Sequence, residues 1–115
     1  MHKLVIIIEP LKDWEAFEEI WPQFLHQVEE MPGLRREVSC RIERFLVGTT
    51  PYERIHELFF DSAADVETAM ASVHGRAAGT LLQKMTGGRM ALFIADHKED
   101  DIENIRKFKG SGFET

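Results

Sequence analysis

The sequence predicts an α+β fold with the element order β-α-β-β-α-β, and three patterns indicate it. Residues 4–8 form a β-branched run that is too short for a helix and rich in strand-forming side chains. Residues 14–31 and 66–85 repeat apolar side chains at steps of three and four, as amphipathic helices do. The segments between and after them alternate polar and apolar residues, or run apolar over strand lengths. We therefore expect four strands and two helical regions.

The first helical region has clear signals at both ends. Asp13 is a typical N-cap residue, and Pro32 with Gly33 ends the helix. Pro22 lies inside this segment. Because proline removes a backbone hydrogen bond and disfavours a helical conformation at Trp21, we expect a kink or two short helices there.

The rest of the chain divides into strands, a turn and the second helical region. Residues 34–45 alternate between a mostly apolar face and a polar face, and a turn at 48–51 follows. Residues 55–60 and 90–95 are predicted strands. The pair His74–Gly75 is expected to interrupt the second helical region.

This element order indicates the ferredoxin-like arrangement, because two βαβ halves fit into one short chain. Right-handed crossovers then place both helices on one face of a four-stranded antiparallel sheet. We assign residues 1–97 to this domain and residues 98–115 to a charged tail. A helical turn is expected in the tail, around residues 102–108.

The predicted strands carry more apolar residues than two helices can cover. The first, third and fourth strands are apolar on both faces, so the second face of the sheet needs a cover of its own. A second copy of the chain, packed sheet against sheet, is one solution. The other is the tail, through Ile102, Ile105 and Phe108. The sequence favours the homodimer and leaves both open.

Composition narrows the class of protein. The 115 residues fit one domain, and a net charge of −6 disfavours nucleic acid or an anionic membrane as partner. No apolar run approaches the roughly 20 residues of a membrane span. The apolar run of residues 4–8 is shorter than the about 7–15 residues of a secretory signal, so we expect a cytoplasmic protein. Cys40 is the one cysteine, which excludes an internal disulfide.

The sequence shows no cofactor motif. No two histidines are four residues apart, the spacing of a helical metal site. Gly87–Gly88–Arg89 lacks the spacing of a phosphate-binding loop and precedes a strand. We therefore predict a protein without a metal or an organic cofactor.

Glu57 is the most informative candidate residue. It lies in the middle of an apolar strand, where a carboxylate is costly to bury unless it is paired or protonated. We predict that it is an acid or base in a cavity, with Arg41 or Ser39 of the neighbouring strand as partner. A structural ion pair with Arg41, or a position at the rim, is the alternative. The hairpin length does not determine the register, and in the other register Glu57 faces Ile42.

Other candidates are weaker. His56 is adjacent to Glu57 in the strand, so its side chain points to the opposite face and is predicted to be a core or rim histidine. Trp21 belongs to an aromatic series at helical spacing, which is more typical of a core than of a ligand-binding box. Tyr52 follows Pro51 in the hairpin, where its hydroxyl orients a ligand or its ring packs on the turn.

Several motifs resemble a known family. They are Phe17-x3-Trp21, the stretch Met31-Pro32-Gly33-Leu34-Arg35-Arg36, Pro51-Tyr52 leading to Glu57-Leu58-Phe59-Phe60-Asp61-Ser62, and an alanine-rich helix with Gly75. Over residues 3 to about 97 the chain resembles the EthD family, named for ethyl tert-butyl ether degradation. That family belongs to the dimeric α+β barrel group, with small monooxygenases and muconolactone isomerase. The resemblance implies a homodimer whose sheets close a barrel-like cavity.

The resemblance also concerns His26. Family members usually carry a histidine four residues after the aromatic residue that matches Trp21, and this chain has Leu25 there. His26 is the next residue, about 100° further around a helix. A kink at Pro22 would be needed to turn His26 in the expected direction.

These observations lead to three hypotheses. The first is an EthD-like homodimer that binds an apolar or aromatic molecule in a sheet-lined cavity, as a cofactor-independent oxygenase or a related catabolic or polyketide enzyme. Glu57 and His26 are its catalytic candidates. The ligand-binding candidates are Arg41, Ser39, Tyr52 and Trp21. The second hypothesis is a non-catalytic binding or accessory protein of the same fold. The third is an isomerase or dehydratase that uses the same glutamate.

Overall fold

The computed structural model describes residues 1–103. Its elements are β1 (His2–Ile8), α1 (Trp14–Glu29), β2 (Arg36–Arg41), β3 (Arg54–Phe60), α2 (Ala63–Ala71), α3 (Val73–Thr86) and β4 (Met90–Asp96). The expected helical turn of the tail extends past this range, so Ile105 and Phe108 lie outside the described residues.

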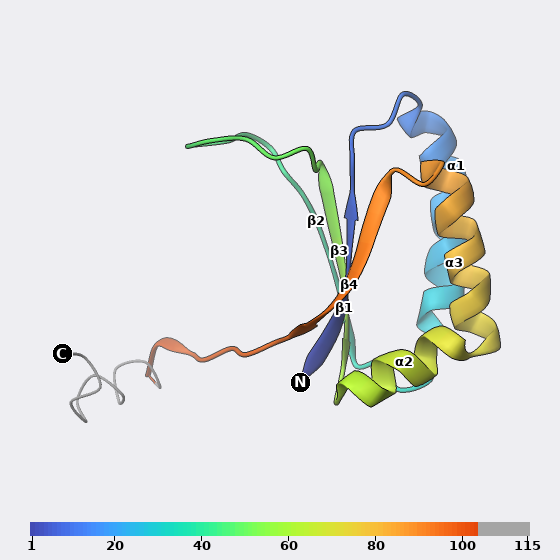
Figure 1. Cartoon of the computed structure of the whole chain (residues 1–115), viewed down its shortest axis with the longest axis vertical. Helices are drawn as coiled ribbons and strands as arrows, with labels where there is room; N and C mark the ends of the chain where they lie inside the picture. Colours follow the sequence, from blue (N-terminus) through green and yellow to red (C-terminus); the bar gives the residue numbers. More distant parts are fainter. Residues whose placement is uncertain (104–115) are drawn as a thin grey trace.

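The four strands form one sheet with the order β2-β3-β1-β4, and each neighbouring pair is antiparallel. This order confirms the ferredoxin-like prediction. In the described part of the chain the helices lie on one side of the sheet only (Figure 1). We call the other side the open face. Its residues are Lys3, Val5, Ile7, Arg36, Val38, Cys40, Ile55, Glu57, Phe59, Ala91, Phe93 and Ala95.

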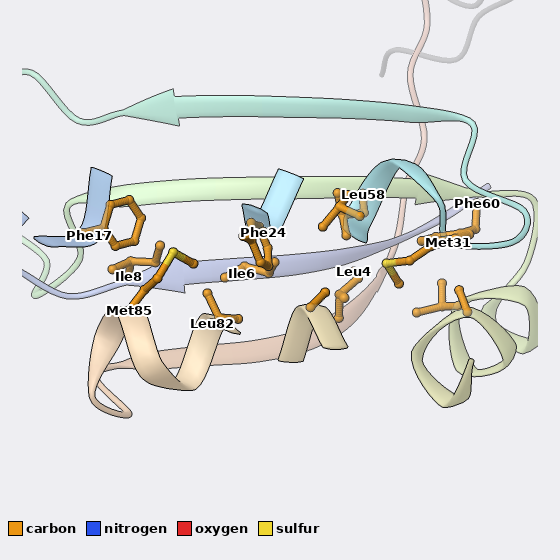
Figure 2. Packing of buried hydrophobic residues seen from close by; sticks show 14 residues of the cluster. Leu4, Ile6, Ile8, Phe17, Phe24, Met31, Leu58, Phe60, Leu82 and Met85 are labelled. Atoms are coloured by element: carbon orange, nitrogen blue, oxygen red, sulfur yellow. The ribbon is translucent and has the colours of Figure 1, made fainter. Parts of the chain in front are cut away.

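The hydrophobic core lies between the helices and the sheet. Alternate residues of β1, Leu4, Ile6 and Ile8, point toward the helices and are at most 5% exposed. Phe17 and Phe24 of α1 pack on them, and α3 adds Leu82 and Met85, among others (Figure 2). The helices therefore cover one apolar face of β1 and do not cover its other face.

Helix α1 is one continuous helix. The predicted N-cap is confirmed, since the Asp13 side chain accepts a hydrogen bond from the Ala16 amide at 3.0 Å. Of the two outcomes expected at Pro22, the division into two short helices is wrong, because residues 14–29 are helical throughout. An internal proline costs about 3 kcal/mol. Burial of Phe17 and Phe24 on either side of it stabilises the helix by a similar amount or more.

The second helical region divides at Ser72, two residues before the expected position. The Ser72 hydroxyl donates to the Ala69 carbonyl and accepts from the Gly75 amide, so it caps α2 and α3 together. Gly75 is required at this corner because a Cβ atom there would overlap the Ala69 carbonyl oxygen and lie 2.8 Å from the Met70 backbone. This tight corner brings α3 back across the sheet.

None of the helices within residues 1–103 combines the length and the apolar character that a bilayer crossing needs.

Replacing Gly75 by alanine is expected to lower the free energy of unfolding by about 1–3 kcal/mol, because the added methyl group overpacks the corner. Gly79→Ala is the matched control. Gly79 lies one turn later in α3, where a Cβ atom meets nothing within 4 Å, and alanine favours a helix by up to about 1 kcal/mol. Urea unfolding measures both variants. Equal effects would contradict the close approach of α2 and α3.

Candidate functional site

An ion pair lies at the centre of the open face. Glu57 of β3 is directly opposite Val5 of β1 and Val38 of β2. The Lys3 ammonium lies 2.7 Å from the Glu57 carboxylate, and the two side chains are 17% and 22% exposed. A carboxylate and a cation are therefore held together, mostly screened from water, among the mainly apolar side chains of the open face.

The partner predicted for Glu57 is wrong. In the observed register β2 places Val38 opposite Glu57, Ser39 opposite His56 and Arg41 opposite Arg54. Directly opposed residues share a face, so Ser39 and Arg41 point to the helix side of the sheet. Sequence reasoning paired Glu57 with β2 alone and missed Lys3 on the other neighbouring strand. The sequence does carry a signal for Lys3. It lies two residues before Val5 on the central strand β1, so its side chain points to the same face of the sheet as Val5 and Glu57.

The end of the open face near the N-terminus is covered by cations and by the start of the tail. Phe59 is 1% exposed, although it points away from the helices. The Arg36 guanidinium lies 4.3 Å from the centroid of its ring, and the His97 ring meets it edge-on at 4.7 Å. Glu99 lies 2.9 Å from both Arg36 and His97. The hydrogen bond with His97, followed by the charge of Arg36, holds the pKa of Glu99 below its ordinary value.

The rest of the open face is apolar and partly uncovered. Phe93, beside Val5, is 46% exposed. The described part of the tail leads away from the sheet, and Ile102 in it is 62% exposed (Figure 1). The tail therefore covers Phe59 but, over residues 97–103, does not cover Phe93. The part of the tail that the structure describes therefore reaches only the Phe59 end of the open face, and the predicted cover by Ile105 and Phe108 lies outside the described residues.

On the helix side, β3 holds a buried histidine. The His56 side chain is 3% exposed, and its ring lies edge-on to Trp21 at 5.1 Å and Phe24 at 6.0 Å. This confirms the prediction of a core histidine on the face opposite Glu57. Its Nε2 lies 3.3 Å from a Glu37 carboxylate oxygen, and its Nδ1 has no hydrogen-bond partner among residues 1–103.

Burial makes this histidine sensitive to protonation. Desolvation lowers the pKa of His56 from the ordinary 6.5, while the charge and hydrogen bond of Glu37 and the charge of Glu57 oppose the shift. Glu37 was missed at the sequence level. As the cross-strand neighbour of Leu58, it lies on the helix side of an edge strand, where a carboxylate reaches both solvent and the buried ring.

The remaining candidates lie away from Glu57. Trp21 is half-buried on the helix side, where its ring stacks on Phe17 and Phe24 at 5.2 Å each. His26 is exposed on α1 and lines a groove of about 680 Å³ with Pro22 and Leu81, among others.

Two further candidates lie at the β2–β3 hairpin. Tyr52 is half-buried in the loop, where its amide donates to the Thr50 hydroxyl at 3.2 Å. Arg41 is exposed at the end of β2. Within one chain, the sheet therefore separates Glu57 from Arg41, Ser39, Trp21 and His26.

Residues 1–103 contain no group of three or more histidine, cysteine or acidic side chains arranged to hold a metal ion.

Known structures share this architecture, although no protein-family model and no curated protein matches the chain. An EthD family protein from Bacillus halodurans C-125 is similar with a TM-score of 0.77 and 26% identity, over 85% of this chain and 99% of that protein. The EthD resemblance is confirmed. The likeness extends over nearly the whole length of that structure.

Two more distant structures show the same fold. A dimeric ferredoxin-like protein of unknown function from Jannaschia sp. CCS1 has a TM-score of 0.62 and 14% identity, over 84% of this chain and 97% of that one. SnoaB, a cofactor-independent oxygenase from Streptomyces nogalater, has a TM-score of 0.60 and 13% identity, over 86% and 93%. At these identities the likeness concerns the fold alone.

Protonation of His56 is expected to destabilise the fold. Because its pKa is lowered on folding, the unfolded chain binds more protons at this site. The free energy of unfolding therefore falls as the pH decreases below about 6.5, with a slope of at most about 1.4 kcal/mol per pH unit. Urea unfolding between about pH 5 and 8 measures the slope.

The control for this prediction is a second histidine. His56→Gln removes the contribution of the buried ring, whereas His26→Gln alters an exposed ring and keeps the slope of the wild type. If the wild type and His56→Gln show the same pH dependence, the assignment to His56 is wrong.

Proposed function

We propose that two copies of this chain pack open face to open face, and that the chamber between them binds an apolar or aromatic molecule beside Glu57. The observation that carries the proposal is an ion pair held in the centre of an apolar sheet face that the chain's own helices do not cover. The proposed dimer is also supported by the ferredoxin-like protein from Jannaschia sp. CCS1, which is described as dimeric.

Burial favours this association. Removing Phe93 and its open-face neighbours from water stabilises the dimer by roughly 25 cal/mol per Å² of apolar surface buried. The charges do not oppose it, because Lys3 and Glu57 already compensate each other at 2.7 Å. An uncompensated carboxylate at this position would make the covered face strongly unfavourable.

The ion pair also supplies chemistry. The Glu57 carboxylate is a proton acceptor, and the Lys3 ammonium is a positive charge beside it that stabilises an anion formed from the substrate. A phenol or an acidic C–H group of an aromatic or polyketide-like molecule fits this pair. In an oxygenase, the resulting carbanion or phenolate is oxidised by dioxygen, which is itself reduced. SnoaB, which shares the fold, is a cofactor-independent oxygenase.

A specific observation favours a second candidate function. Glu57 and Lys3 satisfy each other in the chain by itself, as a structural pair does. A non-catalytic binding protein would use the same dimer and the same apolar floor, with the ion pair fixed in place. The two functions differ in whether the charge of Glu57 affects a reaction.

The wild-type protein is expected to have twice its chain mass of 13.3 kDa in solution, as measured by light scattering or sedimentation equilibrium. Phe93→Ser is expected to raise the dimer dissociation constant about tenfold or more, because both copies lose apolar contact area. Ile94→Ser is the matched control. Ile94 is the next residue of β4, 40% exposed, and points to the helix side. A wild-type mass of one chain would contradict the dimer.

Glu57→Gln is expected to lower kcat/KM about 10²- to 10⁴-fold for a substrate identified by mass spectrometry of co-purified ligand, since the base is removed and its shape is kept. Glu37→Gln changes the same residue type on the adjacent strand, on the opposite face. Measuring the turnover of both variants shows on which side of the sheet the reaction takes place. Loss of turnover in Glu37→Gln alone would move the reaction to the His56 side.

A further inference from the structure

The loop between β2 and β3 carries an unusual exposed tip. Residues 42–53 form this loop, and three consecutive apolar residues lie at its tip. Phe45 is 42% exposed, Leu46 is 87% exposed and Val47 is 93% exposed. Single exposed apolar residues are common, but a run of three on a projecting loop is unfavourable in water unless another surface covers it.

The loop is held away from its own domain. Its base is fixed to the sheet, because the Ile42 amide donates to the Glu53 carbonyl at 2.9 Å and the Glu53 amide donates to the Ile8 carbonyl at 2.8 Å. A groove of about 510 Å³ is lined by Arg41 at the end of β2 and by Glu43, Arg44 and Leu46 of the loop. The high exposure of Leu46 and Val47 shows that the tip does not fold back onto the apolar surface of its own chain.

The direction of the loop indicates what covers it. In Figure 1 the loop leaves the sheet on the side of the open face, and the tail leaves on the same side at the other end of the strands. A body seated on the open face lies between these two projections. A second copy of the chain is such a body, and a symmetric dimer supplies two loops that each reach the other copy.

We infer that the β2–β3 loop is an intersubunit arm: the tip Phe45–Val47 of each copy packs onto the other copy and helps to enclose the shared chamber. This rests on the proposed dimer and adds a distinct contact to it. The tip lies between Arg44 and Gly48 in the sequence. An anionic lipid surface is a less favourable occupant than a second copy, because the chain has a net charge of −6 and is repelled by such a surface. The second copy is therefore the partner that fits.

The first test is a double substitution, Leu46→Ser with Val47→Ser. It is expected to raise the dimer dissociation constant at least tenfold in sedimentation equilibrium. Val73→Ser is the matched control, because Val73 is 80% exposed at the start of α3 on the helix side, and its replacement is expected to leave dimerisation unchanged. All three side chains are solvent-exposed in one chain, so thermal unfolding of the dissociated protein is expected to be equal in the variants.

The second test locates the contact. A benzophenone amino acid is placed at position 46, and ¹⁵N-labelled and unlabelled protein are mixed and irradiated. We expect mass spectrometry to find cross-links that join a labelled chain to an unlabelled one, because these form only between two copies. If the wild type is dimeric but the double variant dimerises equally well and cross-links form within one chain, the arm is wrong and the dimer stands. A wild-type monomer would overturn both. Binding to phosphatidylglycerol vesicles that the double variant loses, with dimerisation unchanged, would identify a lipid anchor instead.

Discussion

Strand β1 is the constraint on which the rest of the molecule depends. It occupies a central position in the sheet and is apolar on both sides, with Val5 4% exposed toward the open face and Ile6 2% exposed toward the helices. One side is covered by α1 and α3, which fixes the helix layer and the core. The other side forms the floor of the open face. Within residues 1–103 the single helix layer covers one of the two apolar faces, and the proposed function follows from this imbalance.

The register around β1 determines the chemistry of that floor. Pairing of β1 with β3 brings Lys3 and Glu57 onto one face, and the neighbouring strand β2 contributes Val38 rather than a charged residue. A shift by one residue would have placed Glu57 among the core aromatics of α1 and His56 on the open face. The same alternation thus separates a mostly buried ion pair on the open face from a buried, proton-sensitive ring on the helix side. These two groups adjoin in sequence but serve opposite sides of the sheet.

Most of the fold was predictable because its signals are local. The N-cap at Asp13 and the strand run 4–8 need only neighbouring residues to form, and both were confirmed. The division expected at Pro22 was wrong because burial of Phe17 and Phe24 outweighs the local penalty of proline. The second helical region divides at Ser72, two residues before the expected position, and here too a tertiary contact outweighs the local pattern. It depends on the approach of α2 to α3, which Gly75 permits and which no local pattern reveals.

The sequence by itself determined the class of the fold, the surplus of apolar strand residues and the opposite orientations of His56 and Glu57, since each of these depends on periodicity along one element. The tertiary structure alone decided which residues meet. Lys3 joins Glu57 across 54 positions, Glu37 joins His56, and the apolar tip of the β2–β3 loop projects past the open face instead of folding onto it. Periodicity sets the face on which a side chain lies, but only strand order and register set its neighbours on that face.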